Sequence, residues 1–307
     1  MKKAYFYIDD TIWVLRDLTR QRPASLFDNA FMKMLKEAHD KYGLKVQLNL
    51  FYRTDSFYGY DQFSLADMTD AYKMEFQANS DWLKMAFHAF EEFPDYPHVN
   101  ATYDDTLWLF KNIEKEVFRF AGKNSFAYSV CPHWLPMSKE GVRALRDCGV
   151  KLLDVTCGDA TEYNGDPFSL PYGHALRLLN NRQSETKVFS RGGRDTAIAR
   201  SVCGYNHIDR KTDDEIFGTL KTVYNEEFDI AFKRYCSTCL NVTPYEELDE
   251  EFAPLLGGEY LGICDHEQYF YSDYLAYQPD YAGKINKMCE ILTANGFEFI
   301  CGEDLLK

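Results

Sequence analysis

The stretch YFYIDDT, Tyr5–Thr11, is a run of strand-forming apolar residues that ends abruptly on two adjacent carboxylates. Such a run predicts a buried β-strand whose carboxyl end carries the charge. In α/β folds the carboxyl ends of the strands are where chemistry is usually assembled. The stretch therefore predicts an α/β fold with a polar site formed close to its first strand.

Asp9 and Asp10 form the polar end of this predicted strand. Neighbouring residues on a strand point to opposite faces, so both acids reach one site only if the chain bends after Ile8. One carboxylate would then bind a cation while the other stays available as a base. The alternative interpretation is that the pair opens a turn or caps the next helix.

The bulk composition limits the class of protein. A chain of 307 residues allows one large α/β domain or two smaller ones, and 46% hydrophobic residues are enough for a core. A net charge of -14 argues against binding to nucleic acid or to an anionic membrane, because both need basic patches. Neutral and cationic ligands are both compatible with this charge.

The nine cysteines are scattered and odd in number, which is not typical of a disulfide framework. Cys236 and Cys239 have the spacing Cys-x-x-Cys, but no second pair completes a zinc site, so we interpret them as structural or incidental. Asp9 interrupts the N-terminal apolar run, and no segment approaches the length of a membrane span. We therefore expect a cytoplasmic protein without a signal peptide.

Several segments of the chain are typical of β-strands, because each is short, apolar and bounded by polar or turn-forming residues. They are Ala4–Ile8, Lys45–Tyr52, Trp82–Phe87, Ser125–Val130, Lys151–Val155, Tyr260–Cys264 and Phe297–Ile300.

Helical patterns lie between these segments. Apolar residues recur at helical spacing in Phe31–Ala38, Asp104–Phe120, Ser138–Cys148, Asp213–Phe232 and Tyr281–Asn295. The alternation of strands and helices predicts a parallel α/β sheet. Because no linker divides the chain, we predict a single domain over 1–307, a deformed TIM-like (β/α)7 barrel with an insertion around 157–212.

Polar residues with chemical capability follow several of the predicted strands. They are Asp9 and Asp10, Arg53, His88, His133, and the run Asp265–Glu267. The carboxyl ends of the strands in a parallel barrel meet at one face, so these residues would be neighbours. Each one alone is more simply explained as a satisfied or exposed polar group. Together they predict an active site.

Asp10 and His88, with a third oxygen or nitrogen ligand, suit a divalent metal such as zinc. Glu92 follows His88 by four residues and would share its face if the chain coils into a helical turn there. His98 and His133 are alternative third ligands. A water in the open metal position would become a nucleophile near neutral pH.

Three further residues complete this predicted chemistry. Asp9 would take the proton from the water, and His266 would protonate the leaving group. Arg53 would anchor a negative or carbonyl oxygen of the substrate, with a solvated salt bridge as the alternative.

The order of these residues resembles the polysaccharide deacetylase family of metal-dependent carbohydrate esterases, whose fold is a deformed (β/α) barrel. That family opens with Thr-Phe-Asp-Asp-Gly, in which the first Asp is the base and the second is a metal ligand. Tyr7–Thr11 is similar to this motif, with Asp9 and Asp10 in those two places. The resemblance covers most of the chain in order and implies the same two roles here.

The later motifs of the family are matched in part. His88 matches the first histidine of its His-Ser/Thr-x-x-His motif, and Glu92 stands in the place of the second. The segment Cys131–Trp134 lies where the third motif lines the cleft, without the family's arginine, which implies substrate contacts from His133 and Trp134. Ile263–His266 resembles the final Leu-x-His with one extra residue and implies that His266 is the acid.

Three functions are compatible with these observations. The first is a metal-dependent hydrolase that removes an N- or O-acetyl group from a sugar or oligosaccharide. The second is a metal-independent glycoside hydrolase that uses two carboxylates such as Asp10 and Glu267. The third is an inactive carbohydrate-binding relative, which the altered second motif favours. A chelator separates the first two, and binding without turnover identifies the third.

Overall fold

The first strand, β1 (Lys2–Thr11), is the centre of a six-stranded sheet in the computed structural model. The structure describes residues 2–54, 62–93, 97–98, 101–135, 137–155, 222–234, 236–274 and 276–307. The strands are ordered β3-β2-β1-β9-β8, β10 pairs with the first residues of β1, and every pair is parallel. Their bounds are β2 Val46–Phe51, β3 Leu83–Ala89, β8 Thr238–Cys239, β9 Tyr260–His266 and β10 Phe297–Ile300.

A second sheet has the order β4-β5-β7-β6. Its strands are β4 Ser129–Val130, β5 Leu152–Val155, β6 Thr222–Asn225 and β7 Ile230–Arg234, and only the β6–β7 pair is antiparallel. The two sheets meet at their edges, because a parallel bridge joins Met85 of β3 to Phe126 just ahead of β4. The fold is therefore α/β with a largely parallel sheet.

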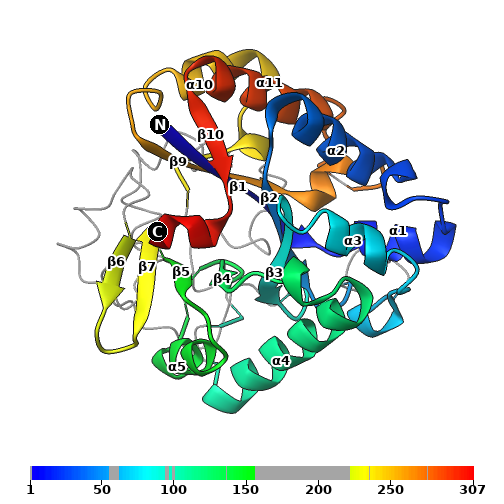
Figure 1. Ribbon diagram of the computed structural model, residues 1–307, viewed down its shortest axis with the longest axis vertical. Coiled ribbons are helices and arrows are strands. Elements are labelled where there is room, and N and C mark those ends of the chain that lie inside the picture. The colour runs from blue at the N-terminus through cyan, green and yellow to red at the C-terminus, as the bar shows by residue number, and fades with distance from the viewer. Residues whose placement is uncertain are drawn as a thin grey trace.

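Helices lie around the outside of the strands (Figure 1). They are α1 Trp13–Gln21, α2 Ala30–Tyr42, α3 Lys73–Ala78, α4 Tyr103–Phe120, α5 Lys139–Asp147, α10 Leu248–Phe252 and α11 Tyr281–Ala294. Local signals set their ends: a capping box of Thr102 and Asp105 begins α4, and Gly43, with a φ of 70°, ends α2.

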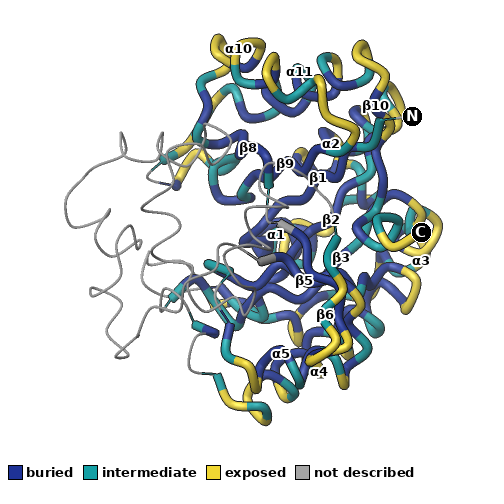
Figure 2. The backbone as a smooth tube through the Cα atoms, turned by 90° about the vertical axis from the view of Figure 1, so that its left-hand side faces the viewer, coloured by how far each residue is buried: buried dark blue, intermediate teal, exposed yellow. Residues whose placement is uncertain are grey.

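Apart from β6, the strands form the buried centre of the molecule, and the exposed residues lie mainly on the surrounding helices and turns (Figure 2). All six residues of β2 are buried, as expected for a parallel sheet with both faces covered. Within the described ranges, no helix is long and apolar enough to cross a membrane.

The predicted strands all occur, although Ser125–Val130 is reduced to the two residues of β4. The predicted helix Asp213–Phe232 is wrong in its described part, because Thr222–Asn225 and Ile230–Arg234 form an antiparallel pair. Residues 230–233 are all buried, as in an interior strand whose two faces are both covered. The predicted insertion around 157–212 lies outside the described residues.

Candidate active site

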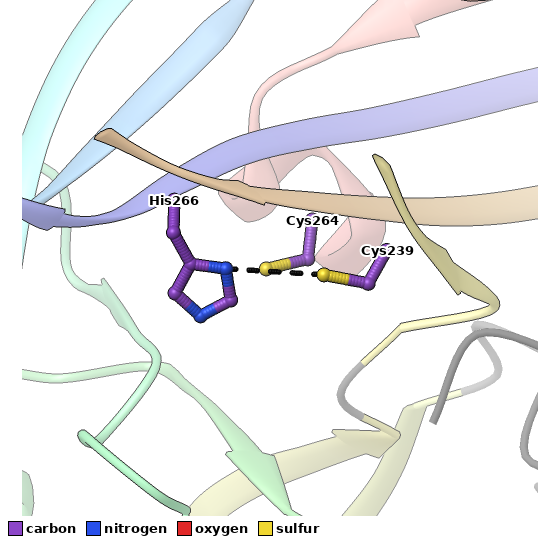
Figure 3. Close-up of side chains that lie close together, drawn as sticks. All are labelled: Cys239, Cys264 and His266. Carbon is purple, nitrogen blue, oxygen red and sulfur yellow. Dashed lines mark hydrogen bonds between the residues drawn. The ribbon is translucent and has the colours of Figure 1, made fainter. Parts of the chain in front are cut away.

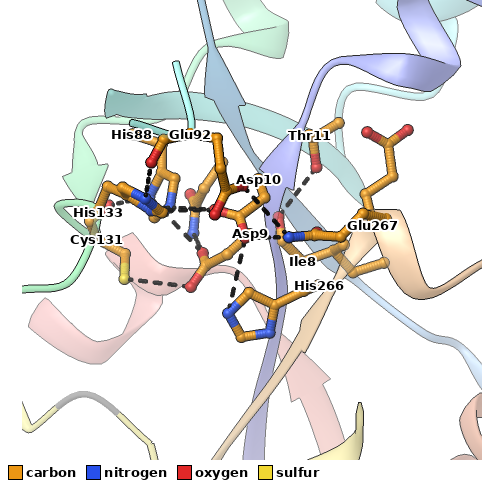
Figure 4. A network of polar contacts seen from close by, with 12 residues as sticks. Ile8, Asp9, Asp10, Thr11, His88, Glu92, Cys131, His133, His266 and Glu267 are labelled. Carbon is orange, nitrogen blue, oxygen red and sulfur yellow. Dashed lines mark hydrogen bonds and ion pairs between the residues drawn. The ribbon is translucent and has the colours of Figure 1, made fainter. Parts of the chain in front are cut away.

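Asp9 and Asp10 lie at the carboxyl end of β1, where the strand is bent. The pairing of β1 with β2 shifts register between Ile8 and Thr11, and Asp10 has a φ of 59°, a region that non-glycine residues rarely adopt. The bend brings both carboxylates into one polar network (Figure 4). This confirms the bend after Ile8, without which the two acids could not reach one site.

Asp10, His88 and His133 form a compact, buried group of three donor atoms (Figure 4). The Oδ1 atom of Asp10 lies 3.1 Å from Nε2 of His88 and 3.1 Å from Nδ1 of His133. The two nitrogens are themselves 3.1 Å apart. Ligands at about 2.0–2.1 Å from a tetrahedral zinc ion stand roughly 3.3 Å from one another, so the group has the size of a zinc triad.

The hydrogen bonds of the two histidines direct their lone pairs into this group. Nδ1 of His88 donates to the carbonyl oxygen of Cys131 at 2.6 Å, and Nε2 of His133 donates to the carbonyl oxygen of Glu92 at 3.1 Å. When both rings are neutral, the two facing nitrogens carry no hydrogen, so their lone pairs point at each other. A cation bound between them, or a proton on one of them, removes this repulsion. Outward donation to carbonyl groups is the usual arrangement of metal-binding histidines. The residues present therefore fit a divalent cation.

The Asp10 carboxylate is held in its charged form. Burial alone raises the pKa of Asp10, but the neighbouring His133 and His88 outweigh burial and hold that pKa well below its usual range. The side-chain amide of Gln268 donates to the other oxygen, Oδ2, at 2.7 Å. One oxygen of Asp10 thus faces the two histidines while the other is fixed by an amide.

Asp9 is buried beside this group and has a separate set of donors. Asn49 donates to Oδ1 of Asp9 at 2.6 Å, while the thiols of Cys264 and Cys131 approach Oδ2 at 3.5 and 3.7 Å. Burial raises the pKa of both thiols well above the usual value, so they remain protonated donors. Asn49 and the two thiols thus hold the Asp9 carboxylate, which also lies 3.9 Å from Nδ1 of His88.

His266 is the last residue of β9 and lies directly opposite Asp9 in the β1–β9 register. Its Nε2 atom is 4.0 Å from Oδ2 of Asp10, and its Nδ1 atom is 2.9 Å from Oδ1 of Asn241. Burial lowers the pKa of His266, but contact with Cys239 and the charge of Asp10 raise it to about 10. The ring is therefore an imidazolium near neutral pH, which is the proton-donating form.

Glu92 and His98 lie outside the three-atom group. The helical turn that would place Glu92 on the face of His88 is absent, because His88 belongs to β3 and the chain bends after Ala89. The carboxylate of Glu92 instead lies 3.5 Å from the amide of Gln268. His98 donates from Nε2 to the carbonyl oxygen of His88 at 2.8 Å, and burial lowers its pKa to about 3. Of the predicted third ligands, His133 is the one whose nitrogen meets Asp10.

The two other predicted substrate contacts are Arg53 and Trp134. Arg53 makes a two-bond pair with Glu91, at 2.8 Å for each bond, and its guanidinium stacks over the ring of Phe90. The salt-bridge alternative for Arg53 is therefore present. Trp134 is partly exposed and adjoins His133, with ring centroids 6.0 Å apart. Substrate contact by these residues stays a prediction.

Glu267 has a structural role in this fold. Its carboxylate accepts three backbone N–H groups at the start of α1, from Ile12, Trp13 and Val14, at 2.6, 2.9 and 2.6 Å. These are the N–H groups that a helix start leaves without intrahelical partners. Glu267 thus caps α1 from a distant part of the chain, and this commitment argues against its use as one of two glycosidase carboxylates.

Several buried polar residues of the site are absent from the predicted set. They are Asn49, Gln268, Asn241 and Cys131 around the carboxylates and His266, with the buried pair Asp154 and Lys233 nearby. A signal exists for Asn49, because Gln47 and Asn49 interrupt an apolar strand two residues apart and so share one face. The other residues come together only through tertiary contacts, which no local sequence pattern predicts.

No family model and no curated protein sequence matches the chain. Among solved structures, the fold is similar to that of a 4-alpha-glucanotransferase from Thermococcus litoralis, with a TM-score of 0.55 and 11% sequence identity. The similarity covers 100% of this chain and 40% of that protein, so the chain spans about two-fifths of its length. At this identity the comparison supports the α/β fold with a parallel sheet.

Proposed function

We propose that this protein is a metal-dependent hydrolase that removes an N- or O-acetyl group from a carbohydrate. The observation that carries the proposal is the triangle of Asp10, His88 and His133, whose donor atoms lie 3.1 Å from one another and face inward. A second carboxylate, Asp9, lies beside it and accepts from Asn49.

Asp10, His88 and His133 would hold the cation, with zinc as the expected ion for one carboxylate and two imidazoles. A divalent cation bound there supplies a Lewis acid that polarises a carbonyl oxygen and lowers the pKa of water. The carbonyl groups of Cys131 and Glu92 accept from the outer ring nitrogens and keep both imidazoles in the binding tautomer. Glu92 would thus act through its backbone rather than its carboxylate.

Asp9 would serve as the base and His266 as the acid of the reaction. Asn49 holds the Asp9 carboxylate at 2.6 Å, in place to accept a proton from the attacking water. His266, with a pKa of about 10, carries a proton that it would give to the departing amine or alcohol. The acid and the base therefore stand on neighbouring strands, opposite one another in register.

The finer features of the fold belong to the same proposal. We propose a single domain over 1–307, built as a deformed (β/α)7 barrel of the polysaccharide deacetylase type. The joined edges of the two sheets at Met85 and Phe126 and the helices around them support this architecture. The Asp-Asp pair at the end of the first strand and the histidine at the end of the third follow the order of that family.

Glycoside hydrolysis without a metal is the main rival. The structural neighbour is named as a glucanotransferase, which makes chemistry at a glycosidic bond worth testing directly. In the described part of the chain, Glu267 is engaged by three backbone N–H groups, which weakens the pair Asp10 and Glu267 as its catalytic residues.

The test is acetate release from a panel of N- and O-acetylated sugars and oligosaccharides, with apo and zinc-loaded protein. We expect zinc-dependent release that EDTA abolishes and that Asp9→Asn eliminates while metal stays bound. Glycosidic cleavage that is insensitive to EDTA would replace the proposal with the glycosidase. Sugar binding without any turnover would identify an inactive relative.

A further inference from the structure

Cys239, Cys264 and His266 form a second cluster of side chains that could bind a metal ion (Figure 3). Cys239 and Cys264 are paired residues in the parallel β8–β9 register, so their side chains share one face of the sheet. His266 follows Cys264 by two residues on β9 and therefore shares that face as well. The pairing of the two strands, rather than local spacing, creates the cluster.

The geometry of the cluster matches that of a thiolate-rich cation site. Sγ of Cys239 lies 3.8 Å from Nδ1 of His266, and the three potential ligand atoms all lie within 4.8 Å of one another. A sulfur at about 2.3 Å and a nitrogen at about 2.0 Å from a tetrahedral ion would stand roughly 3.5 Å apart. Small side-chain movements are therefore enough to close the site around one ion.

The amide oxygen of Asn241 lies against two of these three side chains, where a fourth ligand would be. Its Oδ1 atom lies 2.8 Å from Sγ of Cys239 and 2.9 Å from Nδ1 of His266. Both cysteines are buried and neither is in a disulfide, whereas the side chain of His266 is 24% exposed, which gives an ion a route to the cluster. Two thiols with an imidazole select soft or borderline cations over magnesium or calcium.

We propose that Cys239, Cys264 and His266 form a second metal site, for a thiophilic divalent cation such as zinc. Each thiol that binds forms one metal–sulfur bond and releases one proton to solvent, and no oxidant or reductant takes part. Cys264 then gives up its hydrogen bond to Asp9, which Asn49 still holds. The site goes beyond the proposed hydrolase function and does not depend on turnover. With the second ion on Nδ1 of His266, the ring is neutral and keeps its one proton on Nε2, 4.0 Å from Oδ2 of Asp10, and this is the proton that the acid role would then use.

The test is titration of the reduced, metal-free protein with Co²⁺, followed through the near-ultraviolet sulfur-to-cobalt charge-transfer band. We expect the band in the wild type and in Asp10→Ala, because that substitution removes only the first centre. The double substitution of Cys239→Ser and Cys264→Ser should abolish the band and remove one equivalent of cobalt. The matched control is Cys236→Ser, which removes the other thiol of the Cys-x-x-Cys pair and should keep the band.

Three results would overturn the proposal. One is a wild-type titration that saturates with no thiolate band. Another is a band that survives in the double variant or disappears in Cys236→Ser, since either assigns the sulfur ligands elsewhere. The third is a Cys239–Cys264 disulfide in protein prepared under reducing conditions. If the double variant does not fold, zinc X-ray absorption of the loaded wild type decides, because the site requires two sulfur neighbours at about 2.3 Å.

Discussion

His88 and His133 face each other through ring nitrogens that are 3.1 Å apart, while the opposite nitrogen of each ring donates to a backbone carbonyl. Two lone pairs at this distance repel each other unless a positive charge lies between them. The backbone of two separate loops thus prepares both rings for a shared cation. Asp10 supplies the negative charge that such an ion needs.

The identity of the third ligand gives the first prediction. His133→Ala should weaken zinc binding by more than about 100-fold. Loss of a residue that only hydrogen-bonds to a metal ligand already lowers metal affinity by about 10–100-fold. Glu92→Gln should keep zinc affinity within about 10-fold, since its carboxylate lies outside the triangle. The measurement is zinc competition with a chromogenic chelator in a Cys239→Ser background, so that the thiolate cluster does not contribute. The reverse pattern would return Glu92 to the ligand set.

Asn49 gives a prediction about positioning. Its amide donates to Asp9 at 2.6 Å, and its own oxygen accepts from Gln47 at 2.7 Å, so the amide is held in one orientation. Asn49→Ala should lower kcat by about 10–100-fold while zinc content stays unchanged. Asn49→Asp should also move the acidic limb of the pH–rate profile upward, because a second carboxylate disfavours ionisation of Asp9. Unchanged kcat and profile in both variants would remove Asn49 from this role.

Much of the fold is predictable from local sequence because its signals are local. The apolar run Tyr5–Ile8 and its terminal acids mark a strand and its polar end without reference to the rest of the chain. The same holds for His88 at the end of its strand. The polar ends of separate strands then meet because a parallel sheet places them at one edge.

The composition of the metal triad is not predictable in this way. The choice between Glu92 and His133 depends on whether the chain coils or bends after Ala89, and on how β4 approaches β3 through the bridge at Met85. The pairing of Cys239 with Cys264 likewise comes from strand register, so a search for a second Cys-x-x-Cys could not find it. Residues 222–234 have a helical pattern in sequence but form two strands, because these strands pair with each other in an antiparallel hairpin.

His98 gives a prediction about pH and stability. Its pKa is lowered from 6.5 to about 3, first because burial disfavours the charged ring. Between these values the unfolded chain binds a proton that the folded protein does not, so stability is full above pH 6.5 and falls as the pH falls toward 3.

The matched variant for this prediction is His98→Gln, whose amide can still donate to the carbonyl of His88 but does not titrate. The difference in unfolding free energy between wild type and variant should change by about 1.4 kcal/mol per pH unit below the unfolded pKa. Loss of bound metal at acid pH affects both proteins and cancels in the difference. Parallel stability curves, from urea denaturation across this range, would contradict the prediction.

The last prediction concerns the buried pair Asp154 and Lys233. Their side chains are 1% and 0% exposed, and Nζ of Lys233 lies 2.5 Å from Oδ1 of Asp154. Burial raises the pKa of Asp154 to about 7 against the opposing charge of Lys233, so above pH 7 the carboxylate depends on its partner. Lys233→Met should therefore destabilise the protein by about 3–5 kcal/mol in urea denaturation above that pH, because it leaves a buried charge uncompensated.

The double variant Lys233→Met with Asp154→Leu should recover most of that loss, since it removes both charges and fills the space with apolar atoms. Lys36→Ala serves as the control, because Lys36 pairs with Asp40 on the exposed face of α2 and its loss should change stability little. A double variant as unstable as the single one would mean that Lys233 stabilises the fold through other contacts, such as its position 4.7 Å from the ring centroid of Tyr5. Recovery would instead show that desolvation of the unpaired Asp154 carboxylate causes the loss.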